Sequence, residues 1–155
     1  MRRKDREITD LSKIMEIIEQ CDCCRLGLVD GQEAYIVPLS FGYELADDHL
    51  FFYFHCASEG RKLDLLPKQS IVSFEMDTKH ELVRGELGCQ FSYLYQCVMG
   101  SGMIAPLQER AEKEYALQQI LKHYTGQPQW TFDDQLLNRT TVLKLSVQTL
   151  SCKEH

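Results

Sequence analysis

The chain has 155 residues, of which 44% are hydrophobic and 26% are charged, and its formal net charge is −6. This composition is typical of one folded domain, so we treat residues 1–155 as a single domain. The acidic balance argues against nucleic acid as a partner, because nucleic-acid-binding proteins usually carry a basic face. No apolar run is long enough to cross a bilayer, so the sequence predicts no membrane association.

The N-terminus and the cysteines indicate a reducing compartment. Residues 1–10 are basic but are followed by no apolar core, so they do not form a signal peptide. The chain has seven cysteines, an odd number, and we therefore expect a cytoplasmic protein. Cys21, Cys23 and Cys24 cluster, but the later cysteines provide no second pair of zinc ligands. We predict no metal site, with these thiols acting as small hydrophobic side chains.

The first half of the chain predicts a helix and then strands. Residues 10–20 carry apolar side chains at helical spacing, with Asp10 as a candidate N-cap. The run 24–29 ends at Asp30-Gly31, which is typical of a β-hairpin. Residues 33–44 alternate in polarity, and Pro38 places that run at a sheet edge or a bulge.

Strands continue through the second half. Residues 49–54 are apolar without alternation, which predicts a strand buried on both faces. Further strands are expected within 70–76, 89–105 and 141–150. Helices are expected over about 107–124, ending at Gly126, and after Asp133. Five or six antiparallel strands with peripheral helices predict a mainly β (α+β) fold built on a small barrel.

Residues 51–66, "FFYFHCASEGRKLDLL", suggest a binding site where a strand ends. Ser58 is a candidate N-cap for a short helix whose first backbone N–H groups face outward. Gly60 lets a ligand approach the backbone, and Arg61 and Lys62 add positive charge. These features fit a phosphate monoester, with His55 facing whatever the phosphate anchors. The alternative is a solvated basic turn beside a core histidine.

Several stretches occur in the order seen in one protein family. They are residues 1–10, 24–44, 51–66, 72–82, 95–104 and 117–130. Together they resemble the pyridoxamine 5′-phosphate oxidase-like flavoproteins, and within them the branch linked to 5-nitroimidazole resistance. The resemblance covers about residues 1–150. It implies a split β-barrel that binds FMN at the interface of a homodimer.

The resemblance also implies roles for particular residues. The strand Ile36, Val37, Pro38, Leu39 and Ser40 would run beside the flavin ring. Phe54 and His55 would sit by the cofactor, and the turn containing Ser58, Gly60, Arg61 and Lys62 would hold the FMN phosphate. A histidine near the flavin and the substrate is expected in this branch, and His55 occupies that position.

Two positions depart from the relatives. Cys97 replaces a common serine, and Gln96 is the candidate for that contact. Ala34-Tyr35 replaces a common Pro-Tyr pair.

Three functions follow as hypotheses. The first is an FMN-dependent oxidoreductase that takes electrons from a separate donor and passes them to a small organic acceptor, including nitroaromatic compounds; His55 would be catalytic. The second is a binding protein that stores or senses flavin or haem, with His55 as an axial haem ligand. The third is a metal or redox sensor built on the cysteine cluster. Substrate and electron donor are not defined by the sequence.

Overall fold

The computed structural model describes residues 3–127 and 129–155. Its strands are β1 (Glu7–Ile8), β2 (Cys24–Asp30), β3 (Glu33–Leu39), β4 (Phe41–Ala46), β5 (His49–Ala57), β6 (Ile71–Val83), β7 (Ser92–Pro106) and β8 (Thr140–Glu154). Its α-helices are α1 (Leu11–Glu19), α2 (Arg61–Leu65), α3 (Arg110–Thr125) and α4 (Asp134–Asn138). Short 3₁₀ turns lie at Lys4–Arg6, Leu66–Lys68 and Gly88–Gln90.

Helix ends follow the sequence signals in three cases. The Asp10 side chain accepts hydrogen bonds from the backbone N–H groups of the first turn of α1. Asp133 caps α4 in the same way. Gly126 ends α3 in the left-handed conformation, with φ of 69°, where glycine has no steric penalty. These three predictions are confirmed.

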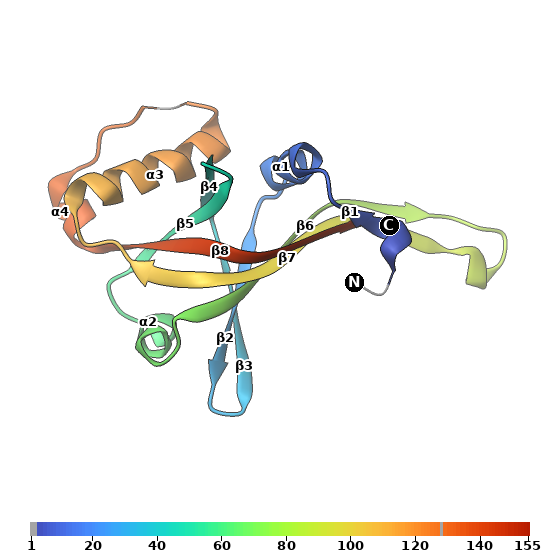
Figure 1. Cartoon of the computed structure of the whole chain (residues 1–155), viewed down its shortest axis with the longest axis horizontal. Helices are drawn as coiled ribbons and strands as arrows, with labels where there is room; N and C mark the ends of the chain where they lie inside the picture. The colour runs from blue at the N-terminus through green and yellow to red at the C-terminus, as the bar shows by residue number, and fades with distance from the viewer. Residues whose placement is uncertain (1–2, 128) are drawn as a thin grey trace.

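All strand pairs are antiparallel, and the strands follow one path in the order β3-β2-β6-β7-β8-β5-β4, with β1 paired to β8 (Figure 1). The two ends of this path, β3 and β4, are joined in sequence by Ser40 alone. One residue can join the two edges only if the sheet curls until those edges approach each other. The fold is therefore a split β-barrel, as predicted.

The barrel interior forms the main hydrophobic core. Alternate side chains of β2, β5, β6 and β8 point inward, and α1 adds the apolar face of its helix to the same cluster. The largest fully buried side chains include Phe41, Phe52, Phe54, Met76 and Leu143. Burying aromatic and aliphatic side chains of this size provides most of the favourable free energy of folding.

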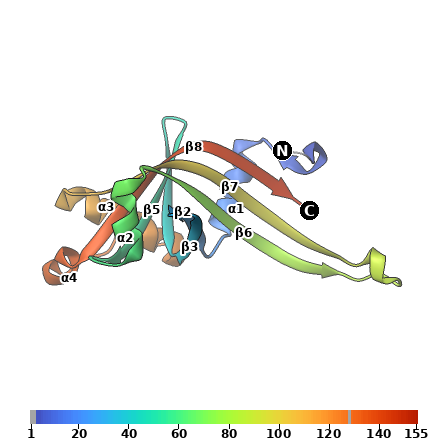
Figure 2. The ribbon, with the colours of Figure 1, turned by 90° about the horizontal axis from the view of Figure 1, so that it is seen from below.

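A second cluster lies on the other face of β5, where α3 packs. Tyr53, Ala116, Ile120 and Val142 are buried together there. The strand β5 is thus covered on both faces, which confirms the prediction for residues 49–54. Figures 1 and 2 both show α3 and α4 gathered at one end of the sheet and the β6–β7 hairpin extending past the other end.

Three predictions need correction. The run 33–44 is not one strand: it breaks at Ser40 into β3 and β4, which lie at opposite edges of the sheet, with Pro38 on edge strand β3. With β1 added, the sheet has eight strands rather than five or six. Ser58 is not an N-cap, because α2 begins at Arg61 and Gly60 occupies the cap position.

Candidate functional site

The predicted strand beside the cofactor, β3, presents its two faces differently. Val37 and Leu39 are half-buried and pack against the barrel core. Ile36 is 63% exposed, and Pro38 and Ser40 also face outward. Among the described strands β3 pairs only with β2, so its other edge has backbone groups that can hydrogen-bond a ligand.

The basic turn lies against the tip of the β2–β3 hairpin. The Arg61 guanidinium donates from Nε to Asp30 Oδ2 at 2.7 Å, and its Nη2 lies 2.6 Å from the same oxygen. Glu33 is 3.9 Å away, and Cζ of Arg61 lies 4.8 Å from the centroid of the Tyr35 ring. The hydrogen bond to Asp30 raises the pKa of Arg61, so the guanidinium stays charged. Among the described residues these contacts leave Nη1 available to a ligand.

Gly60 gives the turn an open backbone. Its φ of 133° suits glycine, and a Cβ added there would meet no atom within 4 Å. Lys62 lies on the same turn and is half-buried. A short anionic group can therefore reach the backbone between two cationic side chains. The α2 helix has only five residues, so we attribute the attraction to these side chains rather than to a helix dipole.

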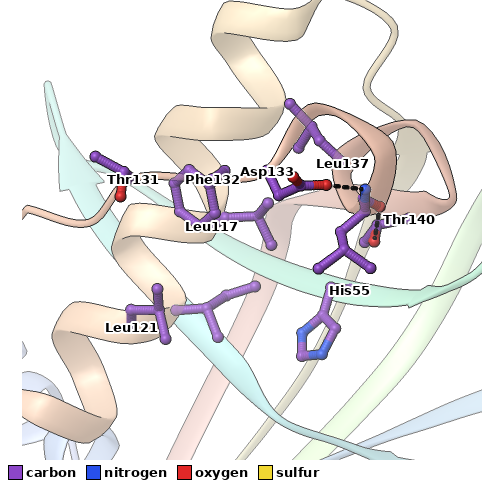
Figure 3. Close-up of a pocket in the computed structure, with 10 residues that line it drawn as sticks. His55, Leu117, Leu121, Thr131, Phe132, Asp133, Leu137 and Thr140 are labelled. Atoms are coloured by element: carbon purple, nitrogen blue, oxygen red, sulfur yellow. Dashed lines mark hydrogen bonds between the residues drawn. The ribbon is translucent and has the colours of Figure 1, made fainter.

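His55 lies on the face of β5 opposite the core side chain Phe54, which is completely buried. It lines a cavity of about 300 Å³ between β5, α3 and α4 (Figure 3). The cavity wall is mainly apolar; it includes Leu117, Ile120, Leu121, Phe132, Leu136 and Leu137.

Two other polar side chains of this cavity are engaged. Asp133 accepts from the backbone N–H groups of Gln135 and Leu136, and the Thr140 hydroxyl donates to the Leu136 carbonyl oxygen (Figure 3). No residue in the described ranges hydrogen-bonds the His55 ring. The imidazole is therefore available to hydrogen-bond a molecule in the cavity.

Strand β3 connects the basic turn with His55. At one end, Tyr35 lies under Arg61. At the other end, just past Ser40, Phe41 pairs with Phe54, the residue next to His55 on β5. Tyr35 and Ser40 are roughly 17 Å apart along an extended strand.

Gln96 lies elsewhere. It is 9% exposed, faces α1, and donates from Nε2 to Glu154 Oε2 at 3.1 Å. It pairs with Glu154, whereas His55 pairs with Val142 at the other end of β8. Within one chain, Gln96 and His55 are therefore roughly 40 Å apart along β8. Cys97 faces the opposite side of the sheet from Gln96, near Glu75.

The cysteines show no ligand arrangement. All seven are free thiols, and the described residues contain no cluster of three or more potential metal ligands. Burial raises the pKa of Cys21 to about 12 and raises that of Cys24 further. Such thiols stay protonated and react slowly, which gives the sensor hypothesis no support.

Sequence reasoning did not identify the acidic partners of Arg61 or the cavity wall. Asp30 was visible only as a turn residue. Leu117 and Leu121 are four residues apart on α3, which is the one signal that could have placed them on a common face. The position of that face above His55 depends on the sheet order.

Comparison with known proteins agrees with this architecture. The family model described as pyridoxamine 5′-phosphate oxidase matches residues 10–154. A candidate 5-nitroimidazole antibiotic resistance protein from Bacteroides thetaiotaomicron is 31% identical, with coverage of 96% of this chain and 86% of that chain and a TM-score of 0.82. The chain therefore belongs to the pyridoxamine 5′-phosphate oxidase family. No curated protein matches the sequence.

More distant structures share the fold. The flavocytochrome Anf3 from Azotobacter vinelandii is 19% identical, with coverage of 100% of this chain and 72% of that chain and a TM-score of 0.83. An FAD and haem binding protein from Mycobacterium smegmatis is 15% identical, with coverage of 96% and 72% and a TM-score of 0.80. In the described part of this chain, no helix has the length and apolarity needed to cross a membrane.

Proposed function

We propose that this protein binds FMN and serves as an oxidoreductase that delivers electrons to a small organic acceptor. The observation that carries the proposal is the path of edge strand β3, which leads from the cationic turn at Arg61 to His55. The relatives described as flavin-binding and as linked to 5-nitroimidazole resistance support it.

Each part of the site has a role in this proposal. Arg61 and Lys62, with the open backbone at Gly60, bind the phosphate. The outer edge of β3, from Ile36 to Ser40, offers backbone groups and an apolar surface to the ring. Bound FMN supplies the electron-transfer chemistry.

His55 holds the proton that a reduced acceptor needs. Its ring faces an apolar cavity large enough for a single-ring molecule, which favours nitroaromatic compounds and similar small acceptors. An imidazole can donate a proton from a ring nitrogen and regain one between turnovers.

We also propose a homodimer with the flavin at the interface. Val29, Ile36, Ile71 and Met103 are each at least 50% exposed, although they are large apolar side chains. A second copy would cover such a surface. A dimer would also give Gln96 a role. Gln96 is far from the cofactor site of its own chain, but in a dimer its strand could reach the cofactor bound to the other copy.

The test is the spectrum and reactivity of the purified protein. We expect a flavin spectrum, release of FMN on gentle denaturation, anaerobic reduction by a nicotinamide nucleotide, and reoxidation by a nitroimidazole. A flavin that is not reduced or not reoxidised would contradict the enzymatic role and leave a binding role.

His55→Ala should lower turnover by about 100-fold, as expected for loss of a general acid, while FMN is retained. His49→Ala is the matched control, because His49 is an exposed histidine at the start of the same strand. Unchanged turnover and unchanged flavin affinity in His55→Ala would remove His55 from the mechanism.

A haem-binding protein is the second candidate. His55 at the mouth of a cavity with leucine and phenylalanine walls is an arrangement that also suits an axial ligand. A Soret band in place of a flavin spectrum would favour this candidate.

A further inference from the structure

A second cluster of rings lies at the end of the sheet remote from His55. Tyr93 and Tyr95 are two residues apart on β7, so their side chains share one face. The His80 ring lies nearly parallel to that of Tyr93, at an interplanar angle of 19° and a centroid distance of 6.0 Å. The His155 ring is parallel to that of Tyr95 within 15°, again at 6.0 Å. We call these four side chains the ring platform.

His80 lies in an irregular part of β6, next to a residue with an unfavourable backbone conformation. The β6–β7 register shifts between Thr78 and Glu81, and Lys79 within this bulge has φ of 55°. A positive φ is unfavourable for lysine, and bulges often redirect a side chain toward a site. A pair of rings that only stabilised the sheet would not need this distortion.

The ring of His80 is then fixed by a polar chain. Its Nε2 lies 2.9 Å from Asp77 Oδ2, and Asp77 Oδ1 accepts a 2.7 Å hydrogen bond from Arg25. On the other side, the Lys153 ammonium lies 5.3 Å from the Tyr95 ring centroid. The backbone N–H of His155 donates to the Tyr95 carbonyl oxygen at 3.0 Å. The platform is thus ordered before any ligand arrives.

The platform is open on its outer side. Asp77, His80, Tyr93 and Tyr95 line a shallow cavity of about 460 Å³, and Tyr93 is 51% exposed. Tyrosine rings present electron-rich faces, and stacking on such faces accepts many heteroaromatic rings. Lys153 adds a positive charge beside the rings, which suits a ring that carries a phosphate.

We propose that the ring platform binds a planar nitrogen-containing heteroaromatic ring, such as the base of a nucleotide. The platform is separate from the His55 site within one chain, because Lys153 and Val142 are eleven residues apart on β8, or roughly 35 Å. The bound ring therefore has two sources: a free nucleotide, or the flavin held by a second copy of the chain.

The test uses the full chain with ¹³C-labelled tyrosine rings, titrated separately with AMP, nicotinamide mononucleotide and FMN. We expect the Tyr93 and Tyr95 resonances, assigned with single Tyr→Phe variants, to shift on titration. The double variant Tyr93→Leu/Tyr95→Leu should weaken AMP binding about tenfold, and Tyr93→Phe/Tyr95→Phe should preserve it. Phe91→Leu is the matched control, since it removes a 45% exposed ring from the same hairpin.

The variant Arg61→Gln/Lys62→Gln, which lacks the proposed phosphate site, distinguishes the two sources of the bound ring. A tyrosine shift caused by FMN that vanishes in this variant, while the AMP shift persists, identifies the flavin of a second copy. An FMN shift that persists identifies a free ring. The AMP titration does not involve the proposed phosphate site. It therefore tests the ring platform even if the protein turns out not to bind FMN at Arg61 and Lys62.

Two results would overturn the proposal. One is the absence of tyrosine shifts with all three probes at millimolar concentration. The other is AMP binding that is equally strong in the leucine double variant. If that double variant does not fold, Tyr93→Leu alone replaces it, because Tyr93 is half exposed and contributes little to the core.

Discussion

Glu44 illustrates how one carboxylate can order two strands and a helix. Its Oε2 accepts a 2.7 Å hydrogen bond from the Tyr53 hydroxyl, and its Oε1 accepts a 2.6 Å hydrogen bond from the Tyr115 hydroxyl. Burial alone would raise the pKa of Glu44, but the two tyrosine hydrogen bonds and the charge of Lys144 lower it. The hydrogen bond of Tyr115 to Glu44, together with burial and the charge of Glu44, raises the pKa of Tyr115 to about 12.

The lowered pKa makes this contribution dependent on pH. The ionised carboxylate stabilises the fold fully above the unfolded-state pKa of Glu, about 4.3, and the effect is lost as pH falls through the lower folded-state value. Glu44→Gln should therefore reduce the free energy of unfolding by about 1–2 kcal/mol at pH 7, and by less in strongly acidic solution. Urea unfolding at both pH values measures this difference. An equal loss at both would show that ionisation of Glu44 does not matter.

For individual residues, the sequence predicted which side chains belong to the site but not what they contact. The basic turn and His55 could be identified from residue types alone. The pairing of Arg61 with Asp30 could not, because the two residues meet only when α2 packs against the β2–β3 hairpin. The side on which Gln96 points depends on strand register, which a single sequence does not define.

At the scale of elements, the sequence predicted the helix ends and the hairpin turn, because each of these depends on a few neighbouring residues. Asp10, Gly126 and Asp133 mark helix ends because a cap acts on its own turn. Asp30-Gly31 marked the hairpin because a two-residue turn requires a positive φ, which Gly31 adopts at 64°. The break at Ser40 carried no such signal, since the alternation of polarity runs through it. Only tertiary pairing separates β3 from β4.

Helix α3 approaches β4 through Gly42, where the backbones nearly touch. A Cβ at this position would lie 2.3 Å from the Ile120 backbone nitrogen and 2.4 Å from the Gln119 carbonyl carbon. These are backbone atoms, so α3 would have to move, and with it the wall of the His55 cavity. Gly42→Ala should cost about 1–3 kcal/mol, as for other overpacked sites.

Thermal or urea unfolding of Gly42→Ala provides the measurement. Gly27→Ala is the matched control, because a Cβ there meets the Ser73 side chain at an ordinary 3.7 Å. If both variants were equally stable, close packing of α3 on β4 would not be a determinant of the fold.

For the whole molecule, the arrangement of sites follows from the long strand β8. It pairs with β5 near His55 at its beginning and with β7 near the ring platform at its end. Figures 1 and 2 show the same separation of the helical end from the β6–β7 hairpin. A second copy packed on the exposed outer face is the proposed way to bring the two ends together around one cofactor.

The proposed flavin site depends most on phosphate binding by Arg61 and Lys62. The decisive measurement compares the FMN dissociation constant of Arg61→Gln/Lys62→Gln with that of Arg110→Gln/Lys113→Gln. The control removes the same charge, and Arg110, like Arg61, is about half exposed and lies 2.6 Å from an aspartate oxygen. We predict that the first variant binds FMN about 100-fold more weakly than the wild type, while the control stays within about twofold. Equal FMN affinity in the two variants would contradict the account.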